Sequence, residues 1–138
     1  MKTIYSIIIC LFVMQMTNTL NAQQLADFNL VTTKTFSDDY DLAITSTFEK
    51  EASTLTWIQE SELTNNLQTI VFSVDNVSGT WNETTSTGIL VFDLSIQNTS
   101  YTFTLTGTSS GIMAEIDLSV SSPNENEYSF EDCTINYQ

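Results

Sequence analysis

Carboxylates are the most abundant groups in this sequence that could do chemistry. The chain carries 17 Asp and Glu against three Lys and Arg, and it has no His. Asp38, Asp39 and Asp41 stand close together where a strand is expected to begin. Closely spaced carboxylates are the oxygen ligands that Ca²⁺ prefers. These three residues are therefore a candidate for weak calcium binding, with a solvated acidic turn as the alternative, and no other cofactor is expected.

Two carboxylates that flank a cleft can hydrolyse a glycosidic bond without His or Arg. The glutamates that offer such pairs are Glu49, Glu51, Glu60, Glu62 and Glu83. The short turns of the chain leave little loop from which to build a cleft. The sequence therefore predicts a protein without enzymatic activity, and a paired-carboxylate glycoside hydrolase is kept as an alternative.

Aromatic side chains are the second group of candidates. Trp and Tyr rings can stack on a sugar or line an apolar cavity, and we name Trp57, Trp81 and Tyr101 as candidate ligand-binding residues. The competing interpretation is that these rings fill the core, as inward-facing aromatics usually do.

Missing residue types exclude several kinds of site. Without His the chain has no Ser-His-Asp triad and no His-based zinc or haem site. The formal net charge of −14 argues against binding to nucleic acid or to an anionic membrane surface, since both require a basic face.

Residues 1–22 are typical of a secretory signal peptide. Lys2 precedes the apolar stretch Ile4 to Met16, and a polar run then leads to Ala22. The apolar stretch is too short to span a hydrocarbon core about 30 Å thick. We expect cleavage near Ala22 and a secreted, periplasmic or cell-exterior protein. Cys10 leaves with the leader, and the remaining Cys133 is expected to be buried and inert rather than a reactive thiol or an intermolecular bridge.

Residues 23–138 are expected to form one all-β domain. Apolar residues alternate with polar ones over most of this stretch, which is typical of half-buried strands. Segment 49–63 fits both a strand and a helix, and its Ser and Thr content favours a strand. The sequence thus predicts an antiparallel meander of about eight strands.

An internal repeat indicates how consecutive strands pair. Three segments, at about 70–81, 92–103 and 116–130, each read as strand, short turn and strand. Each predicted hairpin turns one bulky aromatic residue inward, namely Trp81, Phe103 and Phe130. A change of phase near Asp132 indicates a β-bulge.

A meander leaves two exposed edges unless the sheet closes on itself. About eight strands is the number at which an up-and-down barrel closes around its own side chains or one small ligand. A closed barrel is therefore favoured over a two-layer β-sandwich. The run from Gly88 to Phe92 is apolar on both faces, so its outer side should be covered by a loop or a subunit interface.

The function that these features favour is that of an exported, acidic binding module. Its expected partner is a small apolar or glycan ligand, or a protein. The alternative is a structural or adhesive surface protein that assembles, as a homo-oligomer for example, through the face that carries Ile89, Val91 and Met113.

Overall fold

A computed structural model describes residues 25–118 and 127–138 of the chain. The expected signal peptide and most of the turn expected at 121–127 lie outside these residues. No helix of the described residues is long and apolar enough to cross a membrane. The strands are, in chain order, β1 (Phe28–Thr32), β2 (Lys34–Ser37), β3 (Tyr40–Leu42), β4 (Ile44–Glu51), β5 (Thr54–Ser61), β6 (Leu67–Asn82), β7 (Thr87–Ile96), β8 (Thr99–Thr108), β9 (Gly111–Asp117) and β10 (Glu127–Tyr137).

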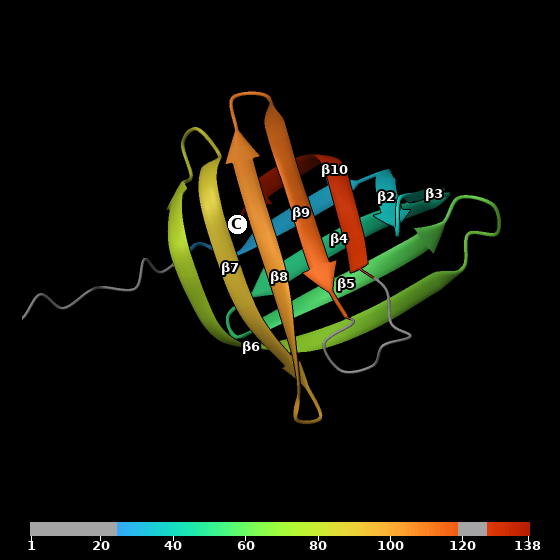
Figure 1. Cartoon of the computed structure of the whole chain (residues 1–138), viewed down its shortest axis with the longest axis horizontal. Helices are drawn as coiled ribbons and strands as arrows, with labels where there is room; N and C mark the ends of the chain where they lie inside the picture. The colour runs from blue at the N-terminus through green and yellow to red at the C-terminus, as the bar shows by residue number, and fades with distance from the viewer. Residues whose placement is uncertain (1–24, 119–126) are drawn as a thin grey trace, which may run out of the picture.

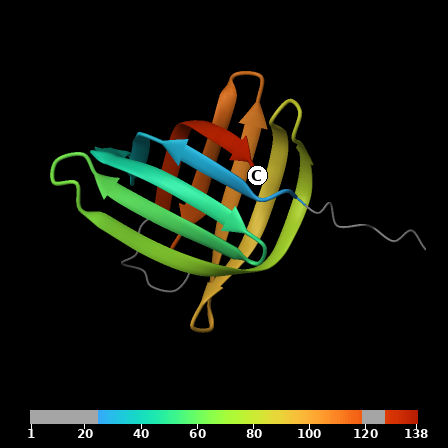
Figure 2. The same ribbon diagram turned by 180° about the vertical axis from the view of Figure 1, so that it is seen from behind.

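The strands form a closed antiparallel barrel, which confirms the predicted fold class. From β4 to β10 each strand pairs with the next one along the chain, and β1 joins β4 to β10 and closes the circle. Eight strands make the barrel, while β2 and β3 are an extension beside β10. In Figure 1, β7 to β10 lie in front and cross β1, β4 and β5 behind them, and Figure 2 shows the same two layers from the other side.

The first hairpin of the chain is bent. Thr33 separates β1 from β2, and Ala43 separates β3 from β4, so the alternating segment from Tyr40 to Ile44 is not one strand but two. β1 pairs with the second half of β10 and β2 with the first half. The turn between β2 and β3 places Asp38 and Asp39 at φ 47° and 68°, as in the two-residue turns that match the twist of a hairpin.

The hairpin expected at 70–81 is wrong, because β6 runs through this segment without a turn. A β-bulge between Val74 and Asn76 bends the strand instead, so that its first half pairs with β5 and its second half with β7. The ribbon of β6 therefore curves from one layer into the other (Figures 1 and 2). Gly79, at φ 103°, lies so close to β7 that a Cβ there would come within 2.2 Å of the Ile89 carbonyl oxygen.

The other repeated segments do form antiparallel pairs. β7 and β8 meet at the turn Gln97–Asn98 with Phe92 opposite Phe103, and β9 pairs with β10. The register of β10 shifts between Phe130 and Cys133, which confirms the bulge predicted near Asp132. Segment 49–63 is the end of β4, a turn and β5.

Aromatic rings from both layers fill the interior. Seven are at most 1% exposed, namely Phe28, Phe48, Trp57, Phe72, Phe92, Phe103 and Phe130. The Phe48 ring lies at the centre, with its centroid 4.8 Å from those of Phe103 and Phe130 and 5.5 Å from that of Trp57. Because these rings expose almost no surface even to water, the middle of the barrel is solid.

The segment before β1 caps one end of the barrel. Leu25 is buried in the core. The Asp27 carboxylate accepts hydrogen bonds from Lys50 Nζ at 2.7 Å and from the Ala52 amide at 2.9 Å. These bonds, led by the one from Lys50, hold the pKa of Asp27 below its usual range. The cap thus joins the N-terminal segment to the β4–β5 turn.

Substitution of Phe48 by Ala should lower the free energy of unfolding by about 3–5 kcal/mol, because it removes the central ring and leaves a cavity. Urea denaturation followed by circular dichroism measures this loss. Val71, 55% exposed on β6, is the matched control, and Val71→Ala should change stability by less than about 0.5 kcal/mol. Equal losses in the two variants would mean that the rings do not hold the barrel together.

Candidate functional site

The two candidate tryptophans both point into the barrel. Trp57 is 1% exposed, and its Nε1 donates to Ser46 Oγ at 3.2 Å. Trp81 is 4% exposed, and its Nε1 donates to Tyr137 Oη at 2.7 Å. Their polar atoms are thus used inside the protein, as is usual for a buried Trp. The structure places both residues in the core and brings neither to the outer surface.

The Trp81 ring packs against a glycine, Gly107, which has no side chain to occupy the same space. A Cβ on Gly107 would lie 2.7 Å from the Cη2 atom of the Trp81 ring and 2.1 Å from the Ser86 carbonyl oxygen. Any larger residue at position 107 would therefore displace the ring or the backbone. This close packing is typical of a structural residue.

Tyr101 lies nearer to the surface than the two tryptophans. It is partly buried, and its ring meets Phe72 edge-on at 5.8 Å. Tyr128 is also partly buried and lies at the start of β10, whose far end pairs with β1 beside the Leu25 cap. The Tyr128 ring contacts Trp57 at 5.1 Å. Tyr101 and Tyr128 thus each contact a fully buried ring.

Of the three candidate calcium ligands, Asp38 and Asp39 line a common hollow and Asp41 does not. Asp38 and Asp39 line a hollow of about 400 Å³ together with Glu115, Glu127 and Ser129, which we call the acidic hollow. Asp41 is exposed on β3 and is not among the lining residues. Within residues 25–118 and 127–138, no group of three Asp, Glu, Cys or His side chains is close enough to hold a metal ion. The sequence does not predict that Glu115 and Glu127 lie beside Asp38 and Asp39, because the pairing of β2 with β10 cannot be read from it.

The glutamates proposed as a glycosidase pair are dispersed. Glu83 accepts a hydrogen bond from the Ala26 amide at 3.1 Å and so belongs to the cap. None of the five lines the acidic hollow or the two hollows described next.

An apolar patch lies on the outside of β7, β8 and β9. Ile89 and Met113 are 53% and 44% exposed. The register places Thr106 opposite both of them, so the three side chains form one row across the sheet. Val91 stands two residues from Ile89 on the same face and is partly buried. We call Ile89, Val91 and Met113 the outer face.

Carboxylates border the outer face. Glu115 follows Met113 on the same side of β9. Asp93 follows Val91 on β7 and accepts a hydrogen bond from Asn76 Nδ2 at 3.1 Å. On β10, Asp132 forms an ion pair with Lys34 of β2. The border is therefore strongly acidic, with one lysine at its edge.

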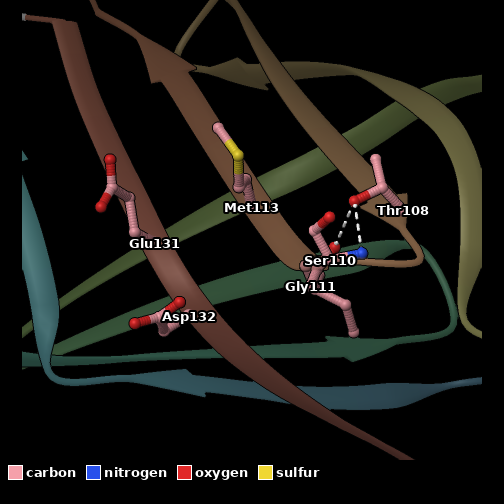
Figure 3. Close-up of a pocket in the computed structure, with 7 residues that line it drawn as sticks. Thr108, Ser110, Gly111, Met113, Glu131 and Asp132 are labelled. Carbon is pink, nitrogen blue, oxygen red and sulfur yellow. Dashed lines mark hydrogen bonds between the residues drawn. The ribbon is translucent and has the colours of Figure 1, made fainter.

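A hollow of about 240 Å³ adjoins Met113, between β9 and β10 (Figure 3). Its lining residues are Thr108, Ser110, Gly111, Ile112, Met113, Glu131 and Asp132. The β10 bulge creates the space, because Glu131 and Asp132 have no partner on β9. Thr108 Oγ1 accepts a hydrogen bond from the Ser110 amide at 3.1 Å, which fixes the turn on the other side. We call this space the bulge hollow.

A third hollow, of about 330 Å³, lies beside the β5–β6 turn. Ile44 and Leu67 supply its apolar wall, and Gln59, Ser61, Thr64, Asn66 and Gln68 supply polar groups. Leu63 stands at the tip of this turn and is 85% exposed. The site combines apolar and amide groups without a carboxylate.

Cys133 is buried, as expected. It is 8% exposed, and its Sγ donates to the Phe130 carbonyl oxygen at 3.5 Å. Burial, with a smaller contribution from the charge of Asp132, raises the pKa of the thiol to about 12. Since the thiolate is the reactive form, Cys133 is inert at neutral pH.

Calcium and magnesium should stabilise the protein to the same small extent. Because no three Asp or Glu side chains of the described residues are close enough to hold a metal ion, we expect either ion to act by reducing repulsion among carboxylates. Melting temperatures at millimolar ion, for the wild type and Glu127→Gln, measure the effect. A larger rise with calcium alone, lost in Asp38→Asn, would instead support the calcium site proposed at Asp38, Asp39 and Asp41.

The described surface thus includes the three hollows and the outer face with its acidic border. No protein-family model, no curated protein and no solved structure matches this chain.

Proposed function

We propose that this chain is an exported, non-catalytic interaction module that binds its partner through the outer face. One observation carries the proposal. Ile89 and Met113 are about half exposed and lie in a single row across β7, β8 and β9. The other exposed large apolar side chains lie on β3, in the β5–β6 turn and on β6, namely Tyr40, Leu63, Leu67 and Val71. Apolar side chains grouped on a surface and rimmed by polar residues are typical of a protein interface.

The position of the outer face on paired strands supports this function. Ile89 lies in a strand with hydrogen-bonded neighbours on both sides, and so does Met113. The backbone on such a scaffold is already ordered, so binding has no cost for ordering a loop. The face is thus already arranged for binding. This function corresponds to a structural or adhesive role for the protein.

A small apolar or glycan ligand is the second candidate. The partly buried Tyr101 and Tyr128, at the end of the strands away from the cap, favour it. A Tyr ring offers an apolar body and a polar hydroxyl, which suits both ligand classes. The middle of the barrel is filled, so such a ligand would contact these residues at the end rather than enter the interior.

Photo-crosslinking in the cells that produce the protein tests the first candidate. A photoreactive amino acid is placed at Ile89 or at Met113, and adducts are detected by their mass after irradiation. We expect adducts from both positions, because a bound partner would lie within reach of both side chains.

Position 71 on β6 serves as the matched control, since Val71 is equally exposed but lies in the part of β6 that pairs with β5. Few adducts should form there. Adducts at position 71 as abundant as those at 89 and 113, or none at any position, would show that the outer face is not the binding surface.

Tryptophan fluorescence tests the second candidate. Trp57 contacts Tyr128, so a ligand at this end of the barrel should change the emission of Trp57. We expect titration with a panel of lipids and glycans to leave the emission unchanged, because the interior is filled and the proposed binding surface is the outer face. A saturable change that Tyr101→Ala weakens would favour the small-ligand function over the outer face.

A further inference from the structure

We infer that the partner of the outer face is a basic, extended protein segment in which a lysine or arginine stands two positions from an apolar residue, so that both side chains lie on the same side of the segment. This inference rests on the proposed function, since it concerns the chemistry of whatever covers that face. It is carried by the charges around the face, the register of the strands and the bulge hollow.

The charges around the outer face are almost all negative. The whole chain has 17 acidic residues and three basic ones. In the described part, Lys50 is committed to Asp27 in the cap, and Lys34 is committed to Asp132. Glu115 therefore borders Met113 without a basic neighbour in its own strand or opposite it on β8 and β10. A partner with positive charge would supply what the face lacks.

The register sets apolar and acidic groups side by side. Met113 and Glu115 alternate on one side of β9, about 7 Å apart at the rise of an extended strand. Val91 and Asp93 repeat this arrangement on β7. In an extended partner segment, residues two positions apart also lie on one side. When an apolar residue of the partner contacts Met113, the partner residue two positions further along therefore lies over Glu115. A lysine or arginine there meets a carboxylate.

The bulge hollow suits a long basic side chain. Ile112 and Met113 offer apolar contact for an aliphatic stem, and Glu131 and Asp132 stand beside it (Figure 3). Lys and Arg characteristically bury the stem and leave the charged group at a polar edge. A volume of about 240 Å³ is that of several water molecules, at about 30 Å³ each, and admits one such side chain.

A second copy of this chain fits the face less well than a basic segment. It would bring the same acidic border and the same net charge, so that carboxylates would face carboxylates across the contact. Glu115 stands on the same side of β9 as Met113, so two copies would bring their Glu115 side chains toward each other. Positive charge from a partner attracts these carboxylates, whereas another copy repels them.

Fluorescence anisotropy with three synthetic peptides tests the inference on the full-length protein. The Leu-Lys peptide repeats Leu-Ser-Lys-Ser, so that Leu and Lys lie on the same side of an extended strand. The Ser-Lys peptide has Ser in place of Leu, and the Leu-Glu peptide has Glu in place of Lys. We expect the Leu-Lys peptide to bind most tightly, and its affinity to fall as salt is raised. Ile89→Ser together with Met113→Ser should weaken this binding about tenfold, as should Glu115→Gln with Glu131→Gln, which should also flatten the salt dependence.

Two matched variants lie in the other layer of the barrel. Val71→Ser removes an equally exposed apolar side chain, and Glu60→Gln removes an exposed carboxylate. Both should bind the Leu-Lys peptide like the wild type. Circular dichroism confirms that every variant remains folded.

Three outcomes would overturn the inference. The first is that the Ser-Lys peptide binds as tightly as the Leu-Lys peptide and that Ile89→Ser with Met113→Ser does not weaken its binding. The attraction would then depend on charge alone. Equal binding of the Leu-Glu peptide would mean that charge does not select the partner. A dimer at physiological salt that Val91→Lys dissociates would identify a second copy as the occupant. In each case adducts at 89 and 113 would still support the outer face, whereas their absence would remove the proposed function itself.

Discussion

The rest of the structure depends on the packing of aromatic rings against one another inside the closed sheet. Phe48 reaches from one layer to Phe103 and Phe130 in the other, so the two halves of the barrel share one core. A barrel of eight strands has just enough interior for its own side chains. Once the rings and the Leu25 cap occupy it, the outer wall and the uncapped end are the surfaces that remain for the binding proposed above.

Much of this fold can be predicted from the sequence, because burial on one face of a strand imposes a period of two. That period places Trp81, Phe103 and Phe130 in the core, and its interruption near Asp132 marks the bulge. The same rule fails in β6. A polar segment with a glycine fits a turn and a bulge equally well, and the choice depends on pairing with β5 and β7, which distant residues decide.

The candidate site is less predictable than the fold. Trp57 and Trp81 are named by residue type, yet their surroundings make them core residues. The outer face is foreseeable, since Ile89 and Val91 alternate with buried neighbours in a run that is apolar on both sides. The two hollows with carboxylates are not, because each joins residues from strands whose adjacency only the register reveals. Glu115 and Asp38, for example, are brought together by β9, β10 and β2 in sequence across the sheet.

The pairing of β1 with β10 also brings the two ends of the described chain together. The Gln138 amide donates to the Asp27 carbonyl oxygen at 2.8 Å, so the first and last strands lie side by side. A short peptide could join them without stretching. New ends could then be opened at the exposed turn Gln97–Asn98, and all strand pairs would be kept. The barrel is therefore suited to circular permutation, in which the outer face is retained while the N- and C-termini move to the turn between β7 and β8.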